Sequence, residues 1–146
     1  MAVERWGQAR KSELLGEMPL FSACSRRELA QVAALTVPSE LAAGTILTRE
    51  GAPGGLAFVL ASGKAEVTRA GKRLATLGPG DVVGELSLID GEPRSATVRA
   101  LTDLEVLEID GSDLDKLMKK VPSVVRKLLE SLAGRLRDAD TMAAPI

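Results

Sequence analysis

The spacing of hydrophobic residues changes twice along the chain and divides it into three parts. Residues 1–35 carry apolar side chains at helical spacing, interrupted by Pro19. Residues 36–110 hold short apolar runs separated by glycines, which is typical of the short strands of a sandwich or barrel. The helical period returns over residues 112–140. The pattern predicts a single domain over residues 1–146, mainly β, with helices before and after the strands.

Local signals mark the expected helix boundaries. Ser25 and Glu28 have the spacing of a capping box, so a helix is expected from about Arg26 to Leu35. Ser112 is expected to cap the next helix, and Pro122 suits the first turn of the last one. The last helix carries a wide apolar stripe: Val124, Val125, Leu128, Leu129, Leu132 and Leu136. Such a stripe indicates that one side of this helix is buried against something.

Within the β region, alternation is clearest over residues 64–68. There Ala65 and Val67 fall on one face of the predicted strand. The segments Ser95–Ala100 and Leu104–Ile109 follow each other closely, and we expect them to pair as neighbouring strands.

Composition limits the classes of function that this chain can have. Of 146 residues, 45% are hydrophobic but only 2% are aromatic, namely Trp6, Phe21 and Phe58. The core must therefore be aliphatic, and a stacking surface for single-stranded nucleic acid is not expected. The net charge of −1 lacks the basic excess of a DNA-binding protein, so no DNA binding by this chain alone is expected.

Histidine and cysteine usage removes further possibilities. There is no histidine, which excludes histidine-dependent catalysis and histidine-ligated metal sites such as those of jelly-roll oxygenases. The single cysteine, Cys24, excludes an internal disulfide and a four-cysteine iron–sulfur cluster. No apolar run is long enough to span a bilayer, and the N-terminus has no hydrophobic signal core. These features predict a soluble cytoplasmic protein that is not an enzyme, with no membrane partner, metal or cofactor.

Residues 84–98 carry the clearest candidate chemistry. An isolated pair such as Glu85 and Arg94 would ordinarily be a weak surface ion pair. Here Gly84 permits close backbone approach, residues 86–89 can form one helical turn with free N–H groups, and Arg94 lies in an otherwise apolar stretch. This setting favours an anion site over a surface pair, and the nearby carboxylate can accept from a hydroxyl group, which suits a sugar phosphate.

A cyclic nucleotide would satisfy both charged groups. Its phosphodiester carries one negative charge, which one guanidinium can contact through two oxygens. Ring closure leaves the ribose 2′-hydroxyl free, and Glu85 is well placed to accept from it.

These residues closely resemble the phosphate-binding cassette of the cyclic nucleotide-binding domain family, with most similarity to the sensor domain of bacterial catabolite activators. The resemblance runs from about residue 20 to residue 140 and does not include the DNA-binding domain of the activators. Further motifs that match are Pro19-Leu20-Phe21, Gly44-Thr45-Ile46, Glu50-Gly51, Ser62-Gly63, Leu77-Gly78-Pro79-Gly80-Asp81 and Ser95–Ala100. The resemblance implies an α+β, mainly β fold: an antiparallel eight-stranded β-roll, jelly-roll-like, flanked by N-terminal and C-terminal helices.

The resemblance also implies a role for each site residue. Glu85 would bind the ribose hydroxyl and Arg94 the phosphate, with a hydroxyl contact from Ser95. The backbone of Gly84 and Leu86 would complete the phosphate cradle. Three apolar residues fall where the family packs the base, although they are equally expected as ordinary core residues: Val67, Leu74 and Val83.

The ligand is expected to be cAMP, with cGMP as the alternative. Ser95 matches the cAMP-binding activators but neither the alanine nor the threonine of eukaryotic members. Ala139 and Asp140 stand where the activators have a polar lid over the base. Arg135 and Asp138 are other candidates for reaching the purine, unless they face solvent.

These features together predict a non-enzymatic sensor that signals through its C-terminal helices. The stripe on the last helix would form a homodimer, contact a downstream protein, or simply pack on the roll. The alternatives are a ligand-free interaction module that retained the fold, or the regulatory domain of a longer transcription factor or enzyme.

Overall fold

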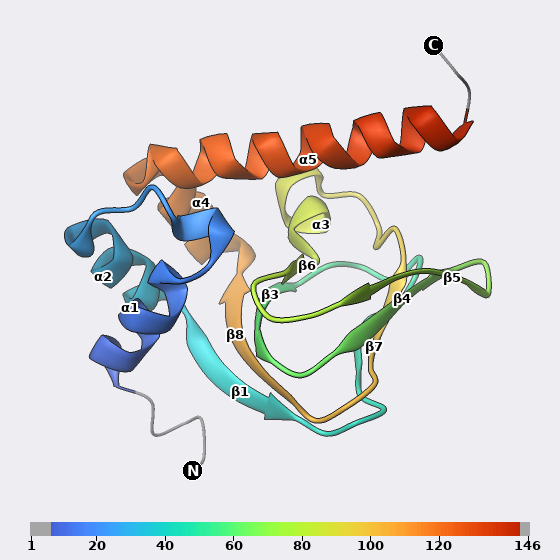
Figure 1. Ribbon diagram of the computed structural model, residues 1–146, viewed down its shortest axis with the longest axis horizontal. Coiled ribbons are helices and arrows are strands. Elements are labelled where there is room, and N and C mark those ends of the chain that lie inside the picture. Colours follow the sequence, from blue (N-terminus) through green and yellow to red (C-terminus); the bar gives the residue numbers. More distant parts are fainter. Residues whose placement is uncertain (1–6, 144–146) are drawn as a thin grey trace.

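Two antiparallel sheets and a set of helices make up the computed structural model (Figure 1). The structure describes residues 7–143, with side chains through residue 138. Trp6 and the side chains of Ala139 and Asp140, which we considered above, lie outside the described residues.

The N-terminal helices are α1 (Gln8–Gly16), the short 3-10 turn η2 (Pro19–Phe21) and α2 (Arg26–Leu35). The predicted capping box is confirmed. Ser25 Oγ accepts from the Glu28 backbone N–H at 3.2 Å, and Glu28 Oε1 accepts from the Ser25 backbone N–H at 2.8 Å. Two of the donors that a helix start leaves unsatisfied are thereby paired.

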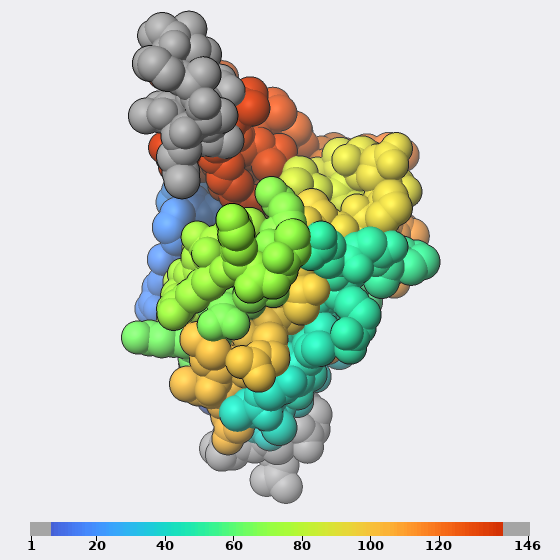
Figure 2. All heavy atoms as spheres, turned by 90° about the vertical axis from the view of Figure 1, so that its right-hand side faces the viewer, coloured from blue at the N-terminus to red at the C-terminus, as the bar shows by residue number. Residues whose placement is uncertain are grey.

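The eight strands form two four-stranded sheets, which confirms the predicted β-roll. In spatial order the first sheet contains β1 (Val37–Leu41), β8 (Leu104–Asp110), β3 (Leu56–Ser62) and β6 (Val82–Val83). In spatial order the second contains β2 (Ile46–Thr48), β7 (Thr97–Ala100), β4 (Ala65–Arg69) and β5 (Lys72–Leu77). Figure 2 shows the side of the molecule formed by the second sheet, with the β4–β5 hairpin standing forward in green.

The expected pairing of residues 95–100 with residues 104–109 is wrong. β7 pairs with β2 and β4, whereas β8 pairs with β1 and β3 in the other sheet. The link between them turns a corner of the roll, where the Leu101 backbone N–H donates to Lys64 O and Asp103 Oδ1 accepts from the Ala43 N–H. Because other loops satisfy these polar groups, the two strands separate without losing hydrogen bonds.

Strand β8 is buried on both faces and divides the core into two clusters. Leu104 and Val106 pack in the interior between the sheets. Leu107 and Ile109 pack against the helices that cover the outer face of the first sheet. Leu107 and Val106 are both completely buried. The roll and its helical cover therefore share one strand as their common wall.

Two helices follow the roll, α4 (Gly111–Lys120) and α5 (Pro122–Ala143). The expected cap at Ser112 is wrong, because Asp110 Oδ1 accepts from the Asp113 backbone N–H at 2.8 Å and starts the helix two residues earlier. α5 begins at Pro122, as predicted, and runs across the top of the molecule above α3 (Glu85–Asp90) (Figure 1). None of the helices within residues 7–143 is both long and apolar enough to cross a membrane.

Candidate functional site

The candidate site is built around the turn from β6 into α3. Gly84 has φ +84°, the left-handed region that glycine tolerates, and it precedes a helix of six residues. A Cβ at Gly84 would collide with Arg94 Nη1 and lie 3.0 Å from Leu56 O. In the structure it is the Arg94 side chain that approaches the Gly84 backbone closely.

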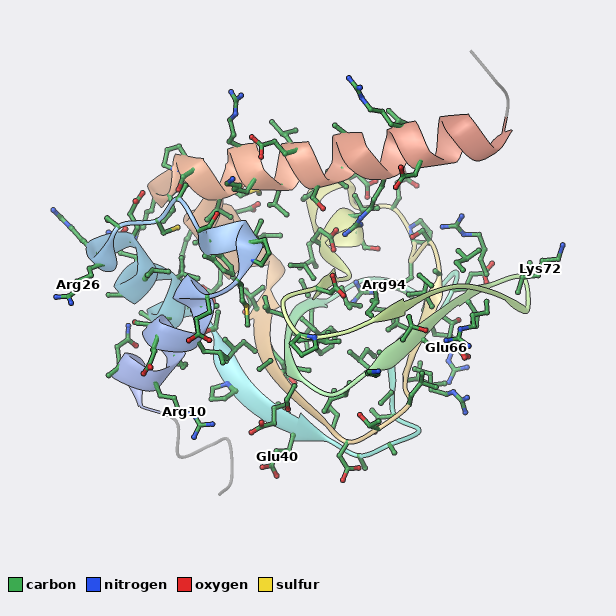
Figure 3. The ribbon with its side chains drawn as sticks, in the orientation of Figure 1. Arg10, Arg26, Glu40, Glu66, Lys72 and Arg94 are labelled. Atoms are coloured by element: carbon green, nitrogen blue, oxygen red, sulfur yellow. The ribbon has the colours of Figure 1, made fainter. Side chains whose placement is uncertain are left out.

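Arg94 points into the protein. Its side chain lies in the interior of the roll below α5 (Figure 3), and only 7% of the residue is exposed. Nη1 donates to Gly84 O at 2.8 Å, and Nη2 donates to Leu56 O at 2.6 Å. Burial lowers the pKa of the Arg94 guanidinium, while the negative charge of Glu85 acts in the opposite direction. The nearest partners of this cation are neutral carbonyls, so an anion placed beside it would be stabilised.

The backbone of Arg94 is held as firmly as its side chain. Its N–H donates to Ala52 O at 2.8 Å, and its carbonyl accepts from the Gly51 N–H at 2.9 Å. The loop between β2 and β3 thus fixes the cassette from the outside, which limits the positions that the guanidinium can reach.

Glu85 is the second buried charge, with 3% of the residue exposed. Its Oε1 accepts from Nη1 of Arg135, on α5, at 3.0 Å. We expected Glu85 and Arg94 to bond to each other or to water. Within the described residues, the two side chains form no hydrogen bond with each other. Arg94 is directed at carbonyls of the roll, whereas Glu85 is directed at the last helix.

Arg135 thus reaches the site, but its observed partner is Glu85. The Arg135 side chain is 52% exposed and contacts the carboxylate from across the chain, 50 residues away. The sequence singled out Arg135 as one of several polar residues near the lid. Nothing local in the sequence indicates the ion pair, because its two members meet only when α5 folds back over α3.

The remaining predicted residues have different surroundings. Ser95 is exposed, and its carbonyl accepts from Arg69 Nε at 2.8 Å, a contact that sequence reasoning missed. Leu86 is 37% exposed on α3. Val83 is buried in the cluster between the sheets, and Val67 packs against that cluster while remaining partly open. Leu74 is 51% exposed on β5.

Of the three candidates for contacting a base, Val83 is already buried as a core residue. Leu74 is the one that still has apolar surface free to cover a ligand. Val67 lies between these two cases.

A cavity of about 420 Å³ opens next to Glu85. It lies between η2, the turn at residues 80–82 and α5, and both Glu85 and Arg135 line it. A second, smaller space of about 30 Å³, lined mainly by apolar side chains of the core, also borders Glu85. The carboxylate therefore has open volume on one side and packed aliphatic groups on the other. No cluster of metal-ligating side chains occurs within the described residues.

This combination defines a class of protein: a β-roll in which a glycine turn, a buried arginine and a buried carboxylate stand together under a C-terminal helix. A family model described as cyclic nucleotide-binding domain matches residues 38–121, which is more than half of the chain. The chain belongs to this family.

Known relatives agree with this assignment. A putative potassium channel protein from Rhodopseudomonas palustris is 30% identical over 126 residues, covering 84% of this chain and 30% of the relative. Among solved structures, the catabolite activator protein of Thermus thermophilus is 33% identical with a TM-score of 0.79, over 86% of this chain and 61% of that one. The cAMP-bound PfPKA-R structure, at 22% identity, shares the fold, with a TM-score of 0.83 over 94% of this chain and 48% of that one.

The matched relatives are longer proteins. The chain spans 28 to 37% of the length of the first four. The region that matches this chain is therefore only a part of each of those proteins. Members of this domain family are regulatory sensing modules.

Proposed function

We propose that this chain binds a cyclic nucleotide, cAMP in preference to cGMP, as a non-catalytic sensor. The observation that carries the proposal is the buried guanidinium of Arg94, fixed by Gly84 O and Leu56 O with only neutral partners in hydrogen-bonding contact. A buried cation in this position is costly unless an anion completes its surroundings. A singly charged phosphodiester supplies one charge, which matches one arginine.

The phosphate end of the ligand would use donors that the protein leaves available. A guanidinium has five N–H groups, and the hydrogen bonds of Arg94 to Gly84 O and Leu56 O use two of them. The remaining donors can hold two phosphate oxygens, and the backbone of Gly84 and Leu86 would complete the phosphate cradle. The Ser95 hydroxyl would add a contact on this side.

The ribose end would use Glu85. Arg135 occupies Oε1, and within the described residues no hydrogen bond engages Oε2. The free oxygen can therefore accept from a 2′-hydroxyl while the ion pair with Arg135 stays in place. A nucleotide that lacks the ring or the free hydroxyl would leave one of the two buried charges without its partner.

The base would lie against Leu74, with Val67 behind it. Leu74 is half exposed on an edge strand, and covering it removes apolar surface from water. This part of the site is open and aliphatic, so it should discriminate only weakly between purines. Recognition should depend more on the contacts of the cassette with the cyclic phosphate.

The signal would leave through α5. Because Arg135 connects Glu85 to the last helix, a ligand that changes the position of Glu85 also changes the equilibrium position of α5. Sensing and output then share one ion pair, and no separate relay is needed.

The exposed side of α5 favours a second copy of the chain as the first recipient of that signal. Leu129 and Leu136 are 61% and 65% exposed. Together with Val125 and Leu132 they recur at intervals of four, three and four residues, the spacing of a two-stranded coiled-coil seam. A downstream segment of a longer protein with the same pattern is the alternative occupant.

Isothermal titration calorimetry with cAMP, cGMP and AMP tests the binding proposal. We expect saturable binding of cAMP, weaker binding of cGMP and none of AMP at comparable concentrations. Arg94→Ala should weaken cAMP binding by a hundredfold or more, on the order of several kcal/mol, because a desolvated charge loses its partner. Arg99→Ala, an exposed arginine on the following strand, is the matched control and should bind as the wild type does.

Two results would contradict the proposal. Absence of saturable binding to both cyclic nucleotides would favour a ligand-free interaction module. Unchanged cAMP affinity in a folded Arg94→Ala variant would remove the role assigned to that side chain.

A further inference from the structure

The second sheet gathers basic side chains that lie far apart in the sequence. Its strands and adjoining turns, residues 45–50, 64–77 and 95–101, contain six basic residues and two acidic ones. All six are exposed: Arg49, Lys64, Arg69, Lys72, Arg73 and Arg99. This is the side of the molecule that faces the viewer in Figure 2, and Figure 3 shows Lys72 projecting from the tip of the β4–β5 hairpin. We call it the basic face.

The two carboxylates of the basic face leave most of its charge uncompensated. Glu50 Oε1 accepts from the Ala70 backbone N–H at 2.9 Å, and Glu66 Oε2 lies 3.9 Å from Arg73 Nε. Within the side chains that the structure describes, four of the cations form no ion pair: Arg49, Lys64, Lys72 and Arg99.

The rest of the chain has the opposite sign. The whole sequence carries 19 basic and 20 acidic residues, so subtracting the six and the two of the basic face leaves 13 basic and 18 acidic. A wide polyanion such as a bilayer or a DNA duplex would bring its charge close to this acidic remainder and be repelled by it. A short anionic segment can lie on the basic face alone.

Aliphatic side chains interrupt the basic face. Ile46 and Leu101 are 37% and 38% exposed, and the Cα of Ile46 is paired in register with that of Arg99. Contact with phosphate groups would leave these aliphatic groups uncovered, whereas a polypeptide can cover them with its own apolar side chains. Arginine is also one of the residues that protein interfaces are enriched in.

We propose that the basic face binds an acidic polypeptide segment, rich in glutamate or aspartate with interspersed aliphatic residues. The segment belongs to a protein partner and lies across β2, β7, β4 and β5. This surface is separate from α5, so the chain can hold a partner here while α5 moves. The proposal does not depend on the proposed function, because none of the four unpaired cations belongs to the candidate nucleotide site.

Fluorescence anisotropy with a labelled oligoglutamate peptide tests the proposal. We expect saturable binding at low salt that weakens steadily as salt is added. The double variant Lys72→Glu with Arg99→Glu should lose at least about tenfold in affinity, because two attractive charges become repulsive. The matched control is Arg26→Glu with Arg27→Glu, which reverses two exposed charges on α2 and should leave peptide binding nearly unchanged.

The outcomes separate this proposal from the proposed function. A calorimetric cAMP titration of each variant reports on the nucleotide site independently, and a thermal melt shows that each variant is folded. The proposal is overturned if the peptide does not bind, or if both double variants bind it alike. It is also overturned if phosphatidylserine vesicles or duplex DNA bind the wild type more tightly than the peptide does.

Discussion

The guanidinium of Arg94 donates to the carbonyl of Gly84 over 2.8 Å, so the glycine turn and the arginine form one unit. Neither residue can change without disturbing the other. The glycine supplies a left-handed backbone and an absent side chain, and the arginine fills the space that a side chain would take.

Gly84→Ala should destabilise the protein by about 2–4 kcal/mol, since the left-handed φ and the collision with Arg94 both oppose it. Gly71→Ala is the matched control. Its φ of +78° is similar, but no atom lies within 4 Å of the added Cβ, so only about 1 kcal/mol should be lost. Urea denaturation of both variants measures the difference. Equal losses would show that the collision with Arg94 does not matter.

Arg94→Lys should bind cAMP about ten- to a hundredfold more weakly than the wild type. Lysine keeps the charge but cannot donate to Gly84 O, Leu56 O and two phosphate oxygens from a planar fork. Calorimetry measures the affinity, and a thermal melt checks that the variant folds. Wild-type affinity in this variant would mean that charge alone suffices.

Arg135→Ala should destabilise the protein by about 1–2 kcal/mol, a figure discounted because solvent screens the half-exposed Arg135. The loss arises because Glu85 stays buried without its cation. Arg126→Ala on the same helix breaks a pair with Glu130 that is exposed on both sides, so it should cost no more than about 0.5 kcal/mol. We also expect Arg135→Ala to weaken cAMP binding. If Arg135 had only a structural role on α5, the affinity for cAMP would stay unchanged.

Leu129→Glu combined with Leu136→Glu should shift a dimer toward monomer, because it places charges in the apolar seam of α5. Sedimentation velocity over a range of concentrations measures the association. A wild-type chain that is monomeric at every concentration would contradict a homodimer formed through α5. A downstream segment of a longer protein would then be the remaining candidate to cover the apolar stripe of α5.

Cys24 should make stability depend on alkaline pH. Burial raises the pKa of the Cys24 thiol, Glu28 adds to the increase, and a contact with Ser123 Oγ at 3.7 Å opposes it. A raised folded-state pKa stabilises the protein below the unfolded thiol pKa, and this stabilisation is lost as pH rises through the folded value. Cys24→Ser should lack this dependence. Urea denaturation from neutral to alkaline pH compares the two proteins, and parallel curves would contradict the expectation.

Local signals allowed much of the fold to be predicted. The capping box at Ser25 and the start of α5 at Pro122 depend on residues within one turn of the helix, and both are observed. Asp110 and Ser112 are both competent caps in sequence, and it is Asp110 that caps α4 in the structure. β7 and β8 are adjacent in sequence but belong to different sheets, and no periodicity records which sheet a strand joins.

The site was predictable where its chemistry is contained within the cassette. Gly84, Glu85 and Arg94 lie within eleven consecutive residues, and Arg94 donates back to Gly84. The partner of Glu85, in contrast, comes from the last helix. The basic face likewise depends on residues that only the fold brings together. Its cations come from three separated stretches, so the nearly neutral sequence conceals a charged surface.

The position of β8 as a wall common to both apolar clusters has a consequence for unfolding. Leu107 cannot lose its neighbours among the helices without loosening Val106, which belongs to the same strand and faces the roll interior. The helical cover and the roll should therefore melt together in one cooperative transition, seen at the same temperature by any spectroscopic probe.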